Sequence, residues 1–121
     1  MPDFVKNIGE SAFSGCSSLT SLTLPSGLTT IGDDAFWGCY SLTSLTLPES
    51  LTTIGDFAFN WCESLTSLTL PSGLTTIGRS AFANCFSLTV LYIPKGTEDH
   101  FKKILPSEYH SMLRIQSNTQ S

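Results

Sequence analysis

Leucines alternate with serine and threonine in short segments that recur through most of the chain. In residues 41–48, Ser-Leu-Thr-Ser-Leu-Thr-Leu-Pro, the leucines are predicted to point inward, while Ser44 and Thr46 point outward. This period of two is typical of a strand with one buried face. Pro48 lacks the N–H group that a further rung of a sheet requires, so we expect the strand to end there.

A second extended segment and a tight turn are predicted to follow each strand. Residues 51–54, Leu-Thr-Thr-Ile, place their leucine and isoleucine inward and their threonines outward. The next residue, Gly55, suggests a turn where the backbone passes close to a neighbour. The preceding copy of the pattern predicts a single helical turn over residues 33–39, which Asp33 is placed to cap and which buries Phe36.

This pattern occurs four times at a spacing of 23 residues. The copies read IGESAFSGCSSLTSLTLPSGLTT from Ile8, IGDDAFWGCYSLTSLTLPESLTT from Ile31, IGDFAFNWCESLTSLTLPSGLTT from Ile54 and IGRSAFANCFSLTVLYIPKGTED from Ile77. A repeat of this length with regularly spaced leucines predicts a leucine-rich solenoid, in which each coil buries its apolar face against its neighbours. We therefore expect an α/β solenoid of four 23-residue coils, with a short parallel sheet and small helical turns on the opposite side.

The repeats are predicted to fill residues 1–96, and a helical cap is expected to follow at 97–115. Thr97 is placed to cap its first helix, and Pro106 to stop or restart it. The apolar residues expected to cover the last coil are Phe101, Ile104, Leu105, Tyr109, Met112 and Leu113. His100 and His110 are interpreted as surface histidines, and residues 116–121 as a flexible tail.

The first repeat is incomplete, because residues 1–8 align with the part of a repeat that follows its strand. The strand expected at 19–24 would then form an open sheet edge. We expect the chain to be a fragment of a longer array, or two copies to meet at this end.

Composition excludes several functional classes. Charged residues make up 13% of the chain and the formal net charge is −4, so the protein lacks the cationic surface that binding to nucleic acid requires. No stretch approaches the ~20 apolar residues of a membrane span, and no secretory signal is present. Glycine-rich phosphate loops, nucleophile elbows and metalloprotease motifs are absent. We therefore expect neither an enzyme nor a cofactor.

One cysteine occupies the same position in each copy, at Cys16, Cys39, Cys62 and Cys85. A row of cysteines does not converge on a point, which argues against a zinc site. Adjacent rungs could come within range of a disulfide, although parallel side chains are poorly directed for one. We favour small, buried thiols that fill the core.

Residues that differ between the copies mark positions free of the core. They place Trp37, Tyr40, Phe57, Trp61 and Phe86 on the side of the helical turns. An exposed aromatic group is typical of a protein–protein hot spot, and an outer packing layer is the alternative. A second candidate surface is the outer face of the sheet, which would carry Ser44, Thr46, Ser67, Thr69 and Tyr92.

The repeated motif LTxLxLPxxLTxIGxxAFxxC resembles the BspA-like class of leucine-rich repeats, named for a bacterial surface antigen. This resemblance implies an extracellular or cell-surface protein used in adhesion to host matrix proteins or to other cells. It offers no catalytic residues. Our leading hypothesis is a protein-binding module, and the alternative is a structural spacer that assembles with other copies through its open first coil.

Overall fold

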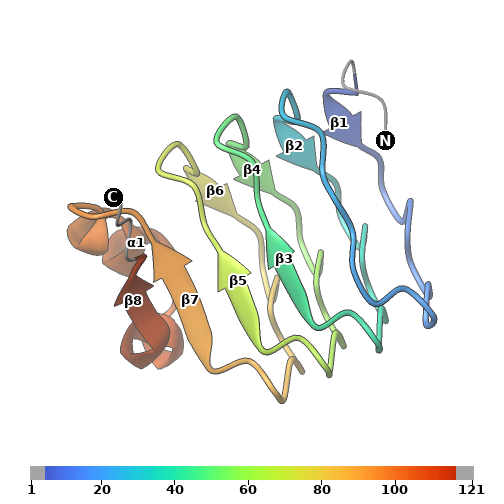
Figure 1. The fold of residues 1–121 in the computed structure, drawn as a ribbon. Coiled ribbons are helices and arrows are strands. Elements are labelled where there is room, and N and C mark those ends of the chain that lie inside the picture. Colours follow the sequence, from blue (N-terminus) through green and yellow to red (C-terminus); the bar gives the residue numbers. More distant parts are fainter. Residues whose placement is uncertain (1–4, 117–121) are drawn as a thin grey trace.

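The computed structural model describes residues 5–116 as a stack of coils that follow one another in sequence order, with a helical segment at the C-terminal end (Figure 1). Two parallel sheets run along the stack. The first contains β1 (Asn7–Ile8), β2 (Thr30–Ile31), β4 (Thr53–Ile54) and β6 (Thr76–Ile77). The second contains β3 (Ser44–Thr46), β5 (Ser67–Thr69), β7 (Val90–Ile93) and β8 (Leu113–Ile115). The predicted leucine-rich solenoid is thus confirmed.

The Leu-Thr-Thr-Ile segments form the first sheet because each strand pairs in register with the same residues of the next copy. Ile31 lies opposite Ile54 and is fully buried. The threonines before these isoleucines also link the coils: the Thr52 hydroxyl donates to the carbonyl oxygen of Thr29 at 3.2 Å. Thr75 repeats this bond to Thr52, also at 3.2 Å. Part of the polar surface of this sheet is therefore used in stacking.

The second sheet carries the leucines of the longer strands into the core. Leu45, Leu68 and Leu91 lie in register on successive strands and are all buried. Beyond β7 the sheet is extended by β8, whose Leu91–Leu113 pairing continues the same row. The cap predicted over 97–115 thus contains helices and ends in this short strand, because the alternating Leu-Arg-Ile of β8 suits a strand with one covered face.

The first copy does not contribute a strand to the second sheet. Residues 20–25 are extended without strand pairing, so the predicted strand at 19–24 was wrong. One backbone bond remains at its start, where the Thr43 N–H donates to Thr20 oxygen at 3.3 Å. The edge of this sheet is therefore β3, in the second coil.

The expected helical turns are instead series of tight turns. In residues 33–38 the Phe36 N–H donates to Ala58 oxygen at 2.8 Å, across to the next coil. A helix would direct that N–H back along its own chain. Asp33 does not cap its own segment either, since its carboxylate accepts the Asp56 N–H of the next coil at 2.7 Å. Alternate N–H groups of these turns therefore link coils, while those between them donate within the turn, as Trp37 does to the Asp34 oxygen at 3.1 Å.

A column of phenylalanines runs through the core beside these turns. The rings of Phe13 and Phe36 stack with centroids 5.3 Å apart, and Phe36 and Phe59 follow at 5.2 Å. Phe82 continues the column and meets Tyr109 of the cap edge-to-face at 5.9 Å. The predicted burial of Phe36 is confirmed, and the cap closes the C-terminal end of the column.

The glycine after each isoleucine permits the close approach that the sequence suggested. A Cβ atom on Gly32 would lie 2.8 Å from the Glu10 nitrogen, and one on Gly55 would lie 2.6 Å from the Asp33 nitrogen. Real Cβ atoms do not approach backbone so closely, so any side chain here would push two coils apart. Gly9, in the first coil, has no heavy atom within 4 Å of the same position.

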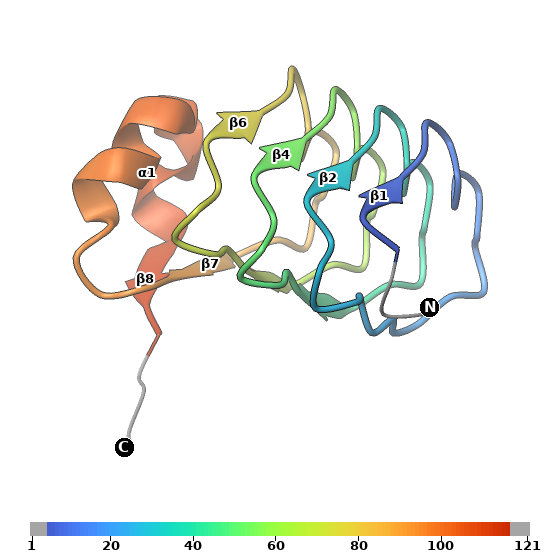
Figure 2. The same cartoon turned by 90° about the horizontal axis from the view of Figure 1, so that it is seen from above.

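The cap packs on the last coil through α1 (Glu98–Ile104) and the 3-10 helix η1 (Ser107–Met112) (Figure 2). Phe101 and Leu105 are buried against the core. The Ile104, Tyr109, Met112 and Leu113 side chains are partly buried there, as expected. The helix stops before Pro106. Thr97 does not cap α1 with its side chain, because its hydroxyl donates to Pro94 oxygen at 2.6 Å instead.

The two histidines of the cap are partly buried, which corrects their assignment to the surface. His100 Nε2 lies 2.6 Å from the Leu74 oxygen, and His110 Nε2 lies 3.0 Å from the Leu105 oxygen. The expected tail begins with Gln116, whose N–H donates to the Ile93 oxygen at 2.8 Å. The rest of that predicted tail, 117–121, lies outside the described residues.

Truncating a core side chain should lower the free energy of unfolding most where two neighbouring coils enclose that side chain. Leu68→Ala should lower the free energy of unfolding by about 2–5 kcal/mol, because Leu68 is 1% exposed. Leu22→Ala changes the equivalent residue of the first coil, which is only partly buried. It should cost about 1 kcal/mol or less. Urea unfolding measures both, and equal costs would contradict the described packing of the first coil.

Adding a methyl group at two equivalent glycines tests the contact between coils. Gly55→Ala should destabilise the protein by more than about 1 kcal/mol, because the new Cβ overlaps the Asp33 backbone. Gly9→Ala is the matched control and should change stability by less than about 0.5 kcal/mol. Thermal unfolding followed by circular dichroism compares the two. A similar loss of stability in both variants would show that the effect of the added methyl group does not come from a clash with the neighbouring coil.

Candidate interaction surfaces

Trp61 and Phe86 form an aromatic pair on the side of the tight turns. Their rings meet edge-to-face with centroids 5.6 Å apart, across the third and fourth coils. Phe86 is 69% exposed, which is far above the other exposed large apolar residues. Trp61 is partly buried beneath it. The pair therefore presents a solvent-facing ring on a partly buried aromatic base.

The backbone at Trp61 adopts a left-handed conformation. Its φ is 66°, in the position where the first two copies have Gly15 and Gly38, at 77° and 73°. Asn84 fills the same position in the last copy, with a φ of 61°. For an L-residue this region costs about 1–2 kcal/mol, and glycine or asparagine tolerates it best. A tryptophan here is therefore retained against a local backbone preference, which points to a role for its ring.

The other three aromatic candidates are spread over the second and third coils. Tyr40 is 38% exposed, whereas Trp37 and Phe57 are partly buried. Phe57 also has a left-handed φ, 58°. In the part of the chain that the structure describes, none of the three makes a ring–ring contact with Trp61 or Phe86. Of the five aromatic residues in the predicted group, Trp61 and Phe86 are thus in ring contact with each other, and the other three are not in ring contact with this pair.

The outer face of the second sheet carries the other predicted residues in two rows. Ser44 lies opposite Ser67, and Thr46 opposite Thr69. The second row continues from Thr69 to Tyr92 and then to Arg114 of β8. Tyr92 is 37% exposed. Arg114 was absent from our predictions because its segment was assigned to the helical cap, although the Leu-Arg-Ile alternation carries the signal.

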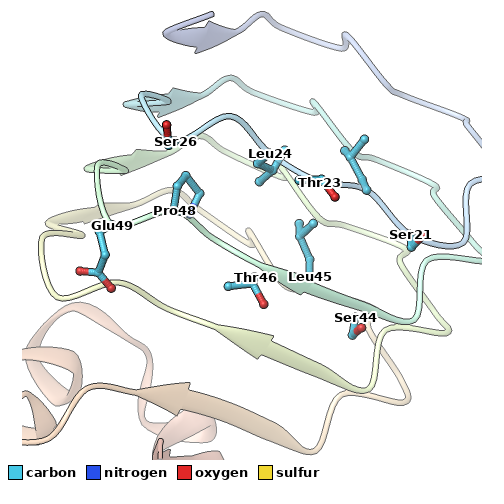
Figure 3. A pocket seen from close by; sticks show the side chains of 10 residues that line it. Ser21, Thr23, Leu24, Ser26, Ser44, Leu45, Thr46, Pro48 and Glu49 are labelled. Atoms are coloured by element: carbon cyan, nitrogen blue, oxygen red, sulfur yellow. The ribbon is translucent and has the colours of Figure 1, made fainter. Parts of the chain in front are cut away.

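A groove that the sequence did not predict lies between the first coil and β3. It encloses about 580 Å³ and is lined by Ser21, Leu22, Thr23, Leu24, Ser26, Ser44, Leu45, Thr46, Pro48 and Glu49. Figure 3 shows that these residues come from two neighbouring segments, with Leu45 between them. We call it the sheet-side groove. Its lining combines leucine side chains with serine and threonine hydroxyls.

The cysteines lie in or beside the core, and three of them donate hydrogen bonds to backbone oxygens of the preceding coil. The Cys62 thiol donates to the Phe36 oxygen of the preceding coil at 3.2 Å, and the Cys85 thiol to the Phe59 oxygen at 3.0 Å. All four are free thiols, and Cys39 and Cys62 are fully buried. Within residues 5–116, no group of three or more potential ligands could hold a metal ion. The expected burial holds for Cys39 and Cys62, whereas Cys16 and Cys85 are only partly buried.

The thiols of Cys62 and Cys85 are held in the protonated form. Desolvation raises the pKa of Cys85 from 9.0 to about 11. The pKa of Cys62 is also raised, by its hydrogen bond with the Cys39 thiol and by burial. A thiolate is the reactive form of cysteine, so these positions are poorly suited to nucleophilic chemistry.

Comparison with known proteins places these surfaces in a family. The family model for the BspA type leucine rich repeat region matches residues 1–105 in six copies. This chain belongs to the BspA-type leucine-rich repeat family. Proteins with these repeats are in general protein-interaction modules. No significant match is found among curated proteins.

Three crystal structures are similar to this BspA-type chain. A leucine-rich repeat protein from Bacteroides ovatus is 33% identical with a TM-score of 0.75, over 92% of this chain and 28% of its own. The T. pallidum leucine rich repeat protein is 28% identical with a TM-score of 0.63, over 76% and 56%. A leucine rich cell surface protein from Faecalibacterium prausnitzii is 34% identical with a TM-score of 0.62, over 77% and 30%.

The BspA-type chain studied here therefore spans about a quarter to just over half the length of these relatives. Among its described helices, none is both long and apolar enough to cross a membrane.

The raised thiol pKa makes this BspA-type protein sensitive to alkaline pH. Cys85 stabilises the fold fully below its unfolded pKa of 9.0, and this contribution is lost as pH rises toward about 11. The sign follows because the unfolded chain releases the proton first in that window. Urea unfolding at about pH 8.5 and about pH 10 should show the loss, at up to about 1.4 kcal/mol per pH unit for each such thiol.

Cys85→Ser is the matched variant, because its hydroxyl retains a donor for the Phe59 oxygen and does not titrate in this range. It should show a shallower fall in stability between the two pH values. If the free energy of unfolding falls equally with pH in both proteins, the Cys85 thiol is not the cause of the loss of stability at alkaline pH.

Proposed function

We propose that this chain is an adhesive module, secreted or exposed on a cell surface, that captures proteins of a host or of neighbouring cells. The Trp61–Phe86 pair is its main contact, and Trp37, Tyr40 and Phe57 form the surrounding surface. The module acts by binding and has no catalytic role. The single observation that carries this proposal is the contact between the exposed Phe86 and a partly buried Trp61 whose backbone is left-handed.

The physical argument is that the pair contributes contact area at a low entropic cost. Phe86 is mostly exposed in the free protein, and its contact with the indole of Trp61 limits its freedom before a partner arrives. Large aromatic side chains dominate the hot spots of protein interfaces. Charged residues make up only 13% of the whole chain, although the exposed Glu63 lies two residues after Trp61. A partner would therefore be recognised mainly by apolar and hydrogen-bonding contacts.

The location on a cell surface is supported by the family and by one relative. The structure from Faecalibacterium prausnitzii is described as a cell surface protein, and it is 34% identical to this chain. The outer sheet face with Ser44, Thr46, Ser67, Thr69 and Tyr92 is the second contact surface in this proposal. Its two rows present hydroxyl groups at the spacing of adjacent strands, about 4.8 Å.

The alternative function is a structural unit that stacks on another copy through the first coil. Phe13, Cys16 and Leu19 favour it, since they are partly buried and line a hollow of about 590 Å³ at that coil. Light scattering over a range of concentrations distinguishes the two functions. A stable dimer would support stacking, and a monomer would favour the side surfaces.

Two substitutions test the two proposed contact surfaces one at a time. Each introduces the residue that other copies of the repeat have at the equivalent position. Trp61→Gly removes the indole and restores the glycine of the first two copies, while Tyr92→Thr restores the threonine of the sheet row. Binding to a panel of immobilised extracellular-matrix proteins is measured by interferometry. We expect Trp61→Gly to weaken binding at least about tenfold and Tyr92→Thr to weaken it less.

Stability provides the control for these variants. Trp61→Gly relieves the left-handed strain and loses one aromatic contact, so its free energy of unfolding should change by less than about 1 kcal/mol. Phe86→Ala should reproduce the binding defect without unfolding the protein. A large loss of stability in either variant would assign the pair to the packing layer and contradict the proposed contact surface.

A further inference from the structure

The fourth coil ends the series of backbone hydrogen bonds that joins the tight turns of adjacent coils. In the third coil, the Phe59 N–H donates to the Ala81 oxygen of the fourth coil at 2.8 Å, and the Phe57 N–H donates across at 2.9 Å. The equivalent donors of the fourth coil are the N–H groups of Ser80 and Phe82. Within residues 5–116, neither of these groups donates a hydrogen bond to the protein.

The two donors of the fourth coil have the same orientation as their counterparts, because the turn repeats the same backbone conformation. The φ values are 58° at Phe57 and 53° at Ser80, then 66° at Trp61 and 61° at Asn84. The N–H groups of the third coil point toward the fourth, so those of Ser80 and Phe82 point on toward the cap (Figure 2). Phe82 is 3% exposed. Buried N–H groups almost always have a partner, so a bound group is expected here.

A small cavity lies in front of these donors, between the fourth coil and the cap. It encloses about 140 Å³, and Ser80 and Phe82 line it from the coil. Pro106, Glu108 and Tyr109 line it from the cap. At about 30 Å³ for each water molecule, this space holds a chemical group of about four non-hydrogen atoms.

The cap wall of this cavity supplies a hydrogen-bond acceptor, the carboxylate of Glu108. Burial and the nearby Glu108 carboxylate raise the pKa of Tyr109 from 10.0 to about 12. The Tyr109 hydroxyl therefore keeps its proton at neutral pH, with the carboxylate beside it. The cavity thus has backbone donors on its coil wall and a carboxylate acceptor on its cap wall.

These two walls select a neutral amide group. In a trans amide the carbonyl oxygen and the N–H point in opposite directions, so the oxygen can face the donors of the coil while the N–H faces Glu108. The equivalent donor of the third coil, at Phe59, already binds an amide oxygen, that of Ala81. A carboxylate or phosphate in the cavity would be repelled by Glu108.

The size of the cavity favours an amide at the end of a molecule. A peptide bond has a chain on both sides and needs a longer channel. An acetamido group ends in a methyl group and has the size that about 140 Å³ accommodates.

We propose that this cavity binds the acetamido group of an N-acetylated sugar. The carbonyl oxygen accepts from the N–H groups of Ser80 and Phe82, and the amide N–H donates to Glu108. The methyl group packs against Ala81 and Pro106, which also line the cavity. The sugar ring stays at the mouth of the cavity, outside the space between coil and cap.

Hydrogen exchange at two equivalent amides tests whether the donors are free. Phe59 and Phe82 both follow an alanine, so their intrinsic exchange rates are similar. In the free protein, the Phe82 N–H should exchange at least about tenfold faster than the Phe59 N–H, which is bonded to the next coil. Equal protection of the two amides would show that the Phe82 N–H already has a partner in the protein, and would overturn the proposal.

A matched pair of sugars tests the occupant. The probe is the methyl β-glycoside of N-acetylglucosamine, and the control is methyl β-glucoside, which has a hydroxyl group in place of the acetamido group. The probe should shift the amide resonances of Ser80 and Phe82 saturably and slow exchange at Phe82 several-fold, while the control should do neither. Equal effects of the two sugars, or none from the probe, would overturn the proposal.

Two further small molecules distinguish other ligands with related chemistry. Tighter binding of acetate than of the probe would assign the cavity to an anion. Tighter binding of N-acetylglycine amide would assign it to an acetylated peptide. Either result would overturn the sugar proposal, and weaker binding of both would support it.

Glu108→Ala tests the acceptor on the cap wall. Glu108 is exposed, so the fold should persist, and probe binding should weaken at least about fivefold. Asp99→Ala is the matched control, because it removes another exposed acid of the cap that does not line the cavity. Equal binding by these two variants would contradict the proposed amide contact. The cavity shares no lining residue with the Trp61–Phe86 surface, so this proposal and the proposed function fail separately.

Discussion

Every feature of this protein depends on the contact between one coil and the next. Each coil is too thin to bury its own apolar residues, so Leu45, Leu68 and Leu91 are shielded only because they stack in register. The backbone follows the same rule, since alternate N–H groups of the tight turns donate across to the next coil, as Phe36 does to Ala58. The side chains of Thr52 and Asp33 add links to partners 23 residues away, and the Cys62 thiol adds one to a partner 26 residues away. A repeat length of 23 residues, which places equivalent residues in adjacent coils, is therefore the constraint that the repeated sequence satisfies.

This constraint also explains where a binding surface can form. A residue that stacks on its own copies in the core is held the same in each coil, so the positions where the copies differ are free to form a surface specific to one coil. Trp61 is the clearest case, because it replaces glycine in a left-handed position and pairs with the exposed Phe86. The unfavourable backbone conformation of Trp61 is compensated by the other contacts that its coil makes with its neighbours.

The two ends of the stack differ in how far their terminal coil is covered by a neighbouring element. At the C-terminal end, Tyr109 meets the phenylalanine column and β8 extends the second sheet, so the cap replaces a further coil. At the other end, the first coil keeps its pairing in the first sheet but has no strand pairing with β3 in the second. The sheet-side groove lies where this pairing is missing.

The sequence by itself determined the solenoid, the inward leucines and isoleucines, the close approach at Gly32 and Gly55, and the burial of Cys39 and Cys62. This was possible because a strict repeat places equivalent residues of adjacent coils in contact. The local pattern of one copy therefore also predicts the contacts between copies. The strand β8, the left-handed turns that replace the expected helix, and the missing strand pairing between the first coil and β3 were decided only by the tertiary structure. In particular, residues 18–25 and 41–48 are identical, so no local pattern could distinguish a free segment from a paired one. Within residues 5–116, what differs is the number of neighbouring coils, and that is a property of the assembled stack.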